Sequence, residues 1–337
     1  MKTLSELEQR VYDELQKRLK QNENKVQETL AQALTSMRGE MSKLYEKYAT
    51  NGILTRAEMT KYNKYITMEK QMLAIIDPAI TDTIKDIRRL SPQMYNESFF
   101  EYAWAMDNGN GVRLSYGNIN PDTVMELFSI TNPKNIEIIE ALKKYKADAP
   151  RLIRSALLNG LSQGKSYSKM MRDIQKALNM IAYKALRIVR TEGQRAINTA
   201  QYDLYLTAKN KGIEGNEVWD AALDNRTRDS HRDADGQVKG EKGVKGKFVI
   251  NGWPALYPLD RDLPAEESIN CRCRTRFEVD GYAPQLRRTR DQGVIPYQTY
   301  DEWKKNYGPT TSRPKRKTSS SLEKIIGAFN AEDLNSE

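Results

Sequence analysis

Three residues in the second half of the chain have side chains suited to binding a metal ion. Cys271 and Cys273 lie two positions apart, so on a strand both thiols project from the same face, where His231 can meet them. Thiolate and imidazole are typical zinc ligands, but a structural zinc site takes four, so Asp233 or Asp235 would have to supply an oxygen. The alternative is a buried cluster of two small side chains beside a hydrogen-bonded histidine. The sequence predicts a structural centre, with one structural zinc as its candidate cofactor.

His231 is the only histidine, which limits the catalytic chemistry that the chain can perform. Mechanisms that use two histidines as acid and base are excluded. The enzyme alternative is a phosphodiesterase or an ADP-ribosyltransferase that uses His231, Arg190 and Glu192. Because a single histidine would have to do most of the acid–base work, we expect that the protein is not an enzyme.

The first half of the chain is expected to be entirely helical. Apolar residues recur at threes and fours from Leu4 to Tyr48 without a proline, which predicts one long amphipathic helix. Asn51-Gly52 ends it, and a capping box at Thr55 and Glu58 opens a second helix. Asp77-Pro78 and Ser91-Pro92 each place a capping residue before a proline, so two further helices are expected to start there.

Helices are also predicted to begin at Asn120-Pro121, at Asn132-Pro133 and at Ser166, and a long basic helix to run from Ala182 to Lys211. Strands appear only later. Short apolar or alternating runs predict them at 217–223, 247–250 and 272–279.

The expected fold is mainly α with a smaller α+β domain. We predict an extended helical domain at 1–149, a compact α+β unit with a few short strands at 150–280, and a flexible basic tail at 281–337. A short docking helix is expected at 322–329 within that tail. No run of 18 apolar residues and no secretory signal is found, and two cysteines are few, so we expect a soluble protein in a reducing compartment.

The net charge of +9 is concentrated in the middle of the chain. Residues 1–150 hold 21 basic and 21 acidic side chains, whereas residues 151–232 hold 15 basic and eight acidic ones. This excess predicts a surface that binds double-stranded DNA without sequence specificity, or an acidic protein partner; a solvated helix face is the alternative. The candidate nucleic-acid or partner-binding residues are Arg151, Arg154, Lys184, Arg187 and Arg195.

Several short motifs follow one another in a fixed order. Arg190-Thr191-Glu192 comes first, then Trp219, the segment from Asp224 to His231 with Asp235-Gly236-Gln237, and finally Asn270-Cys271-Arg272-Cys273-Arg274. Between the last two lie the run 248–252 and Tyr257-Pro258. This order resembles the C-terminal domain of the phage Mu F-like family of minor head (head morphogenesis) proteins, over residues 152–279. The motif comprises Arg190, Glu192, Trp219, Asp224, Arg226, His231, Asp235, Gly236, Asn270, Cys271, Arg272 and Cys273.

The resemblance implies a minor capsid protein of a tailed-phage virion, acting in head morphogenesis and in DNA packaging or delivery. Its expected partners are the portal protein and other capsid or scaffold proteins, with double-stranded DNA as a further one. Its expected location is the capsid interior or the portal vertex, and the host cytoplasm during assembly. Members of the family carry more cysteines around the 224–231 turn, where this chain has Arg, Asp and Ser.

Overall fold

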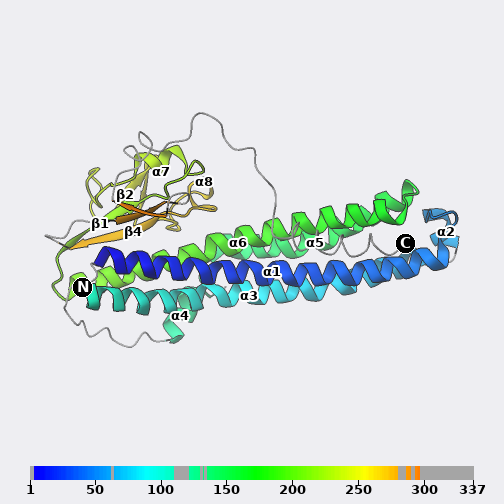
Figure 1. Ribbon diagram of the computed structural model, residues 1–337, viewed down its shortest axis with the longest axis horizontal. Coiled ribbons are helices and arrows are strands. Elements are labelled where there is room, and N and C mark those ends of the chain that lie inside the picture. Colours follow the sequence, from blue (N-terminus) through cyan, green and yellow to red (C-terminus); the bar gives the residue numbers. More distant parts are fainter. Residues whose placement is uncertain are drawn as a thin grey trace. The chain divides into compact units, whose positions relative to one another are not determined.

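The computed structural model describes residues 4–61, 64–109, 121–129, 132, 135–279, 286–289 and 293–296. Long helices dominate these residues (Figure 1). The helices are α1 (Leu4–Tyr48), α2 (Arg56–Lys61), α3 (Lys64–Gly109), α4 (Pro121–Leu127), α5 (Ile136–Ser162), α6 (Tyr167–Asn210), α7 (Asp229–Asp233) and α8 (Ala265–Ser268). The predicted class, mainly α with a smaller α+β part, is confirmed.

Helix α1 has the bounds that its apolar spacing predicted. Its inward stripe is fully buried, as at Leu15, Leu30 and Met37. The chain leaves it through Asn51 and Gly52, which both have positive φ, a conformation that glycine adopts without steric cost. The predicted break at these two residues is therefore confirmed.

Two predicted breaks are wrong: α3 continues through Pro78 and Pro92. A proline inside a helix costs about 3 kcal/mol, because one backbone hydrogen bond is lost. Buried apolar side chains continue at helical spacing on both sides of each proline, for example Ile76, Ile80 and Met94. Burying this continuous stripe outweighs the local cost, and Pro150 lies inside α5 for the same reason. Helix α6 likewise is continuous, so the helix predicted to begin at Ser166 and the one predicted from Ala182 to Lys211 are a single helix.

The described strands form three antiparallel pairs. Strand β1 (Gly215–Asp220) pairs with β4 (Arg274–Val279), so that Asp220 lies opposite Arg274. Strand β2 (Phe248–Ile250) pairs with β3 (Trp253–Ala255), and β5 (Leu286–Thr289) pairs with β6 (Gly293–Pro296). The predicted strands correspond to β1, β2 and β4.

Within residues 281–337, where a flexible tail is predicted, the structure describes one antiparallel pair, β5 with β6. Each strand has only four residues, which is too short for a period of two to stand out in the sequence. The predicted docking helix at 322–329 lies outside the described residues.

The chain divides into two compact units that differ from the predicted linear domains. One contains the described residues within 1–20, 89–134 and 190–316; the other contains those within 21–88 and 135–189. Helices α1, α3 and α6 each contribute to both units, so no boundary falls at residue 149 in this division. The division at 149/150 and 280/281 stays a prediction about which parts fold separately.

The first unit has a small apolar core beneath its strands. The core joins side chains from β1, β2 and β3, from the residues that directly follow β1 and α7, and from the segment before β4. Its members are Trp219, Ala221, Ala234, Phe248, Ile250, Ala255, Leu259, Leu263, Cys271 and Cys273. Both cysteines are therefore part of the core.

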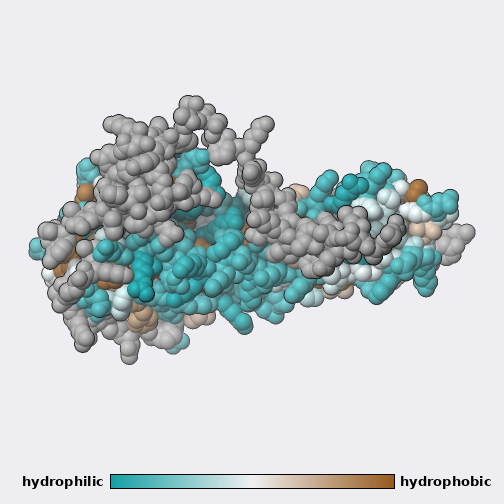
Figure 2. Space-filling view, in the orientation of Figure 1, coloured by the Kyte–Doolittle hydropathy of each residue, from teal (hydrophilic) through white to brown (hydrophobic). Residues whose placement is uncertain are grey.

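Hydrophilic residues cover much of the described surface along the long helices, with scattered hydrophobic ones between them (Figure 2). None of the described helices holds an apolar stretch of the length needed to cross a membrane.

Candidate metal centre

The three predicted ligands meet at one place in the first unit. His231 lies on the short helix α7, and its Nδ1 is 3.2 Å from the sulfur of Cys273 and 3.5 Å from that of Cys271. The three donor atoms all lie within 4.8 Å of one another. The cysteines precede β4 instead of lying on it, and Asn270, with φ of 57°, turns the chain just before them. The sequence thus predicted this juxtaposition, although not the backbone that produces it.

Glu267, on α8, contacts the second ring nitrogen of His231, the one that faces away from the two cysteines. Its Oε2 lies 3.1 Å from His231 Nε2. The same carboxylate accepts hydrogen bonds from Ser230 Oγ at 2.8 Å and Asn251 Nδ2 at 3.1 Å. A histidine that ligates a metal usually donates its second ring N–H to a carboxylate, which fixes the ring. The arrangement of His231 and Glu267 has this form.

The electrostatics of the cluster reflect its burial. Burial opposes the charged form of His231, but its contact with Cys273 and the charge of Glu267 outweigh that effect, so the pKa of His231 is raised. Burial also raises the pKa of Cys271, yet hydrogen bonds from Cys273 and nearby arginine side chains outweigh it and lower that pKa. Burial and the neighbouring Cys271 raise the pKa of Cys273 well above its usual value. Cys271 is therefore the more acidic of the two thiols.

Neither predicted aspartate joins the described cluster of three donors. Asp235 Oδ1 instead accepts a hydrogen bond from the backbone N–H of Ala221 at 2.9 Å, next to the turn at Gly236, whose φ is 79°. Asp233 is exposed and faces the pocket described below. Two thiols and one imidazole suit zinc, and they leave one position of a tetrahedral set to a ligand other than these two carboxylates.

An ion pair between Asp224 and Arg272 connects the loop before α7 to the segment before β4. The Arg272 guanidinium donates to both oxygens of the buried Asp224 carboxylate, at 2.7 Å to Oδ1. Asp224 Oδ1 also accepts from the backbone N–H of Arg226 at 2.9 Å. Burial opposes ionisation, but these bonds outweigh it and lower the pKa of Asp224 to about 2. Asp224 therefore caps a turn that precedes α7, which begins only at Asp229.

The Arg190-Thr191-Glu192 motif lies on α6 and contacts two loops of the same unit. Thr191 Oγ1 accepts from the backbone N–H of Asn270 at 3.1 Å. Glu192 pairs with Arg195 on its own helix and, at 3.3 Å, with Arg261. The motif therefore holds the cysteine-bearing segment and the 259–261 loop against α6.

Trp219 and Asn198 also contact residues of the cluster formed by His231, Cys271 and Cys273. The Trp219 ring is fully buried and meets the His231 ring edge-on, with 5.5 Å between the centroids. Asn198 Nδ2 donates to the carbonyl oxygens of Pro258 at 2.8 Å and Cys273 at 3.0 Å. No local spacing in the sequence marks Asn198 or Glu267, because Asn198 contacts Cys273 across 75 positions and Glu267 contacts His231 across 36.

The residues predicted to bind nucleic acid or a partner do not form one surface. Arg195 is buried and donates to the carbonyl of Leu259 at 2.9 Å, so its assignment to an exposed basic patch is wrong. Arg187 is exposed on α6, and Arg151, Arg154 and Lys184 are engaged with acids. Arg151 and Lys184 both pair with Asp148, at 2.7 and 2.5 Å, and Arg154 pairs with Glu69 at 2.6 Å.

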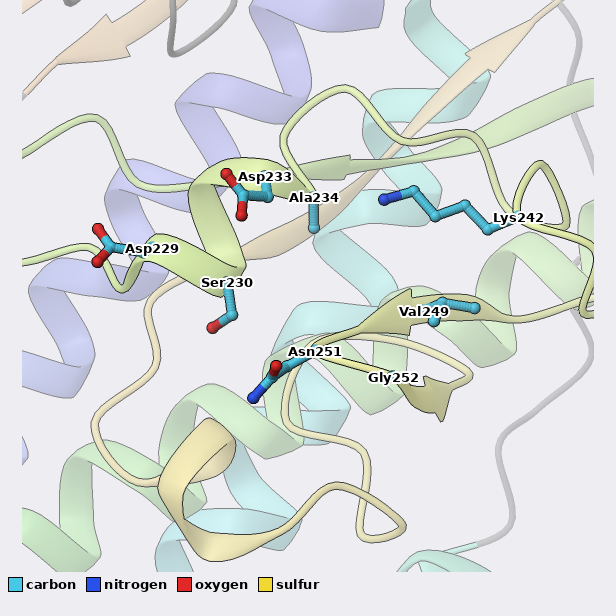
Figure 3. Close-up of a pocket in the computed structure, with 8 residues that line it drawn as sticks. All are labelled: Asp229, Ser230, Asp233, Ala234, Lys242, Val249, Asn251 and Gly252. Carbon is cyan, nitrogen blue, oxygen red and sulfur yellow. The ribbon is translucent and has the colours of Figure 1, made fainter.

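A polar pocket of about 600 Å³ lies beside the cluster without reaching it. Figure 3 shows Asp229, Ser230 and Asp233 on α7 and Asn251 after β2 at its wall. The Ser230 hydroxyl and the Asn251 amide both donate to Glu267. His231 and the two cysteines do not line this pocket.

Cys273, His231 and Glu267 contact one another in a row, in the way that a nucleophile, a base and an orienting carboxylate do in a catalytic triad. Glu267, whose carboxylate contacts the His231 ring, is thus a second group able to act as acid or base beside this histidine. All three side chains are no more than 4% exposed. A catalytic thiol must reach its substrate, so this geometry favours a structural role over nucleophilic catalysis.

Comparisons with known proteins agree with the motif order. Residues 151–276 match the family model described as "Phage Mu protein F like protein". The chain is 29% identical to minor head protein GP7 of Bacillus phage SPP1, over 85% of this chain and 92% of that protein. The resemblance inferred from the motifs is thus confirmed.

Two further relatives are matched over a smaller share of their own length. The NAD(+)--arginine ADP-ribosyltransferase EFV of Enterococcus faecalis is 27% identical, over 84% of this chain and 57% of that protein. An uncharacterized protein of Haemophilus influenzae is 25% identical, over 51% of this chain and 34% of that protein. No solved structure matches the chain significantly.

Proposed function

We propose that this chain, whose residues 151–276 form a Phage Mu protein F-like domain, is a minor head protein of a tailed phage that acts in head morphogenesis. The observation that carries the proposal is the match to GP7 of phage SPP1 over 92% of that protein, which includes the helical first half as well as the motif-bearing domain. Three motif residues, His231, Cys271 and Cys273, support it because they converge in the buried core of the first unit and do not line the pocket beside it.

The proposed location is the capsid interior or the portal vertex, and the proposed direct partner is the portal protein. A minor head protein must be incorporated during assembly, which requires contacts with other head components. Co-expression of a tagged chain with the portal and coat proteins of its own phage tests this. We expect the portal protein to co-purify, and failure to co-purify with any head protein would contradict the proposed partner.

The enzyme alternative rests on the match to EFV, which covers 57% of that protein. Against a shared activity, Glu192 is buried between two arginines and His231 lies in the core, and neither lines the pocket formed by residues that the structure describes. Incubation with labelled NAD⁺ and an arginine-rich acceptor should give no transfer and no NAD⁺ hydrolysis. Activity that is lost in Glu192→Gln but retained in the exposed control Glu266→Gln would support the enzyme instead.

We further propose that His231, Cys271 and Cys273 hold one structural zinc ion, with Glu267 orienting the imidazole. The fit rests on three converging soft donors and on the carboxylate bonded to the far ring nitrogen. Metal analysis of protein purified without chelators should find about one zinc per chain. Cys271→Ser should lose the metal and lower the melting temperature.

A matched pair of variants separates ligand orientation from general destabilisation. Glu267→Gln removes the charge that orients His231 and should weaken zinc binding about 10- to 100-fold. Glu266→Gln alters an exposed neighbour and should leave zinc binding unchanged. Protein free of zinc, with a melting temperature that neither added zinc nor a chelator shifts, would show that the cluster is only packed.

A further inference from the structure

Several asparagines of the chain are followed directly by a glycine, a pair that is chemically labile. Glycine has no side chain to hinder its backbone nitrogen, which can attack the amide carbon of the preceding asparagine. Two such pairs, Asn108-Gly109 and Asn159-Gly160, belong to helices, where the glycine N–H bonds to the carbonyl four residues earlier. Two others, at positions 51–52 and 251–252, form tight turns outside the helices.

Both turns leave the attacking nitrogen accessible. Asn51 and Gly52 have φ of 52° and 71°, and Asn251 and Gly252 have φ of 49° and 83°. The backbone pairing that closes each turn joins the flanking residues, and no hydrogen bond involves either glycine N–H among the described residues. All four residues are exposed, and a Cβ added to either glycine would meet nothing within 4 Å.

The two turns differ in what holds the asparagine side chain. Asn251 Nδ2 donates to Oε1 of the buried Glu267 at 3.1 Å, whereas the structure describes no partner for the amide of Asn51. Ser230 Oγ donates to the other oxygen of the same carboxylate at 2.8 Å, and Asn251 and Ser230 lie near one another at one end of the pocket (Figure 3). The chain therefore contains one restrained and one unrestrained Asn-Gly turn.

We infer that Asn251 is a site of spontaneous deamidation, and that its hydrogen bond to Glu267 restrains the reaction. The nitrogen of Gly252 attacks the side-chain carbonyl carbon of Asn251, and its proton passes to the amide nitrogen, which leaves as ammonia. Water from the pocket then opens the resulting cyclic imide at one of its two carbonyls. The product is aspartate when one carbonyl is attacked and isoaspartate when the other is.

The restraint follows from the geometry that the attack requires. The nitrogen of Gly252 and the side-chain carbon of Asn251 must approach to about 3–3.5 Å, so the amide has to rotate toward its own backbone. Rotation breaks the bond to Glu267, and a hydrogen bond to a charged group is stronger than one between neutral groups. Because Asn251 is also exposed to water, we expect the lower end of that range, a rate about 10-fold below that of Asn51.

Deamidation at this position would loosen the cluster around His231. A carboxylate at position 251 cannot donate to Glu267, and two carboxylates at hydrogen-bond distance repel each other. Ser230 would then be the remaining donor of the two that fix the Glu267 carboxylate against the His231 ring. Isoaspartate would also lengthen the backbone of the two-residue turn that sets the pairing of β2 with β3.

The test follows each Asn-Gly pair of the full chain separately. Protein is incubated in neutral buffer without denaturant, and peptide mass spectrometry measures the conversion of each asparagine over time. In the unaltered chain we expect Asn51 to convert about 10-fold faster than Asn251. Asn159 is exposed but helical and should stay unconverted, which also reports that the protein is folded.

A matched pair of variants tests the restraint itself. Glu267→Ala removes the acceptor and should raise the rate at Asn251 to that of Asn51. Glu266→Ala, at the exposed neighbouring position, should leave the rate at Asn251 unchanged. If Asn159 also converts in Glu267→Ala, that variant is unfolded, and the ratio of Asn51 to Asn251 in the unaltered chain decides.

Equal rates at Asn251 and Asn51 in the unaltered chain would overturn the restraint, and a faster rate at Asn251 would show that Glu267 assists the attack as a base. No conversion of Asn251 in a folded Glu267→Ala variant, while Asn51 converts, would overturn the site. For the product, Asn251→Asp should lower the melting temperature whereas Asn51→Asp should not, and equal melting temperatures would contradict the loosening. None of these outcomes depends on bound metal or on the proposed head function.

Discussion

Glu8 is a buried carboxylate near the N-terminal end of α1, and it should make the stability of the protein depend on pH. It accepts a hydrogen bond from the Tyr205 hydroxyl at 2.9 Å. Next to it, the side-chain oxygen of Gln9 accepts from Arg274 Nη2 at 2.8 Å, and Arg274 also pairs with Asp220 at 2.7 Å. This polar network fastens the start of α1 to the β1–β4 pair.

Burial raises the pKa of Glu8 from 4.5 to about 7, although the charge of Arg274 opposes that rise. An acid whose folded pKa is raised binds its proton more tightly when folded, so folding is penalised as the pH rises. The penalty is absent well below pH 4.5, grows between 4.5 and about 7, and is complete above that. From these two pKa values it amounts to about 1 kcal/mol at pH 5 and about 3 kcal/mol at pH 8.

Glu8→Gln removes the ionisation and keeps an oxygen for the Tyr205 hydroxyl. We expect the variant to exceed the unaltered protein in stability by about 3 kcal/mol at pH 8, with the gain falling to about 1 kcal/mol at pH 5. Urea denaturation at half-unit pH steps measures this difference. The control Glu28→Gln, at an exposed position of α1, should change stability by less than about 0.5 kcal/mol.

The pH dependence of the difference decides the outcome. If Glu8→Gln were destabilising at pH 8, Glu8 would be an ionised partner of Arg274 and the argument from burial would be refuted. A gain that did not change with pH would refute it equally, since the effect would then arise from packing.

Three further substitutions test the packing of the first unit. Gly215→Ala should destabilise by about 1–3 kcal/mol, because the added Cβ would lie 2.6 Å from the carbonyl oxygen of Glu278 on the paired strand; thermal unfolding measures this. Asn198→Ala should cost about 2–4 kcal/mol by leaving two buried carbonyl groups without a donor, and an equal stability would contradict that. Trp219→Ala should cost about 3–5 kcal/mol in urea titration, because it empties the centre of the core.

The sequence predicts the fold well where one physical signal dominates. The bounds of α1 follow from an uninterrupted apolar stripe, and the turn at Asn51 and Gly52 follows from their tolerance of positive φ. Pro78 and Pro92 mislead because local proline chemistry favours a break, whereas burial along α3 favours continuity. Only the tertiary structure shows which contribution is larger.

The sequence also predicts only part of the candidate site. His231, Cys271 and Cys273 stand out by residue type, and they do converge. Glu267 does not stand out, because exposed and buried glutamates look alike in a sequence and its contact with His231 spans 36 positions. Arg195 shows the opposite error, since counting charges does not distinguish a buried, paired arginine from an exposed one.

The central claim, that this chain is a minor head protein, is tested most directly by quantitative mass spectrometry of purified virions and DNA-free heads of its own phage. We predict that peptides of the chain are present in both, at a small fraction of the amount of coat protein. Complete absence of these peptides from both kinds of particle, while portal and coat peptides are detected, would contradict the claim.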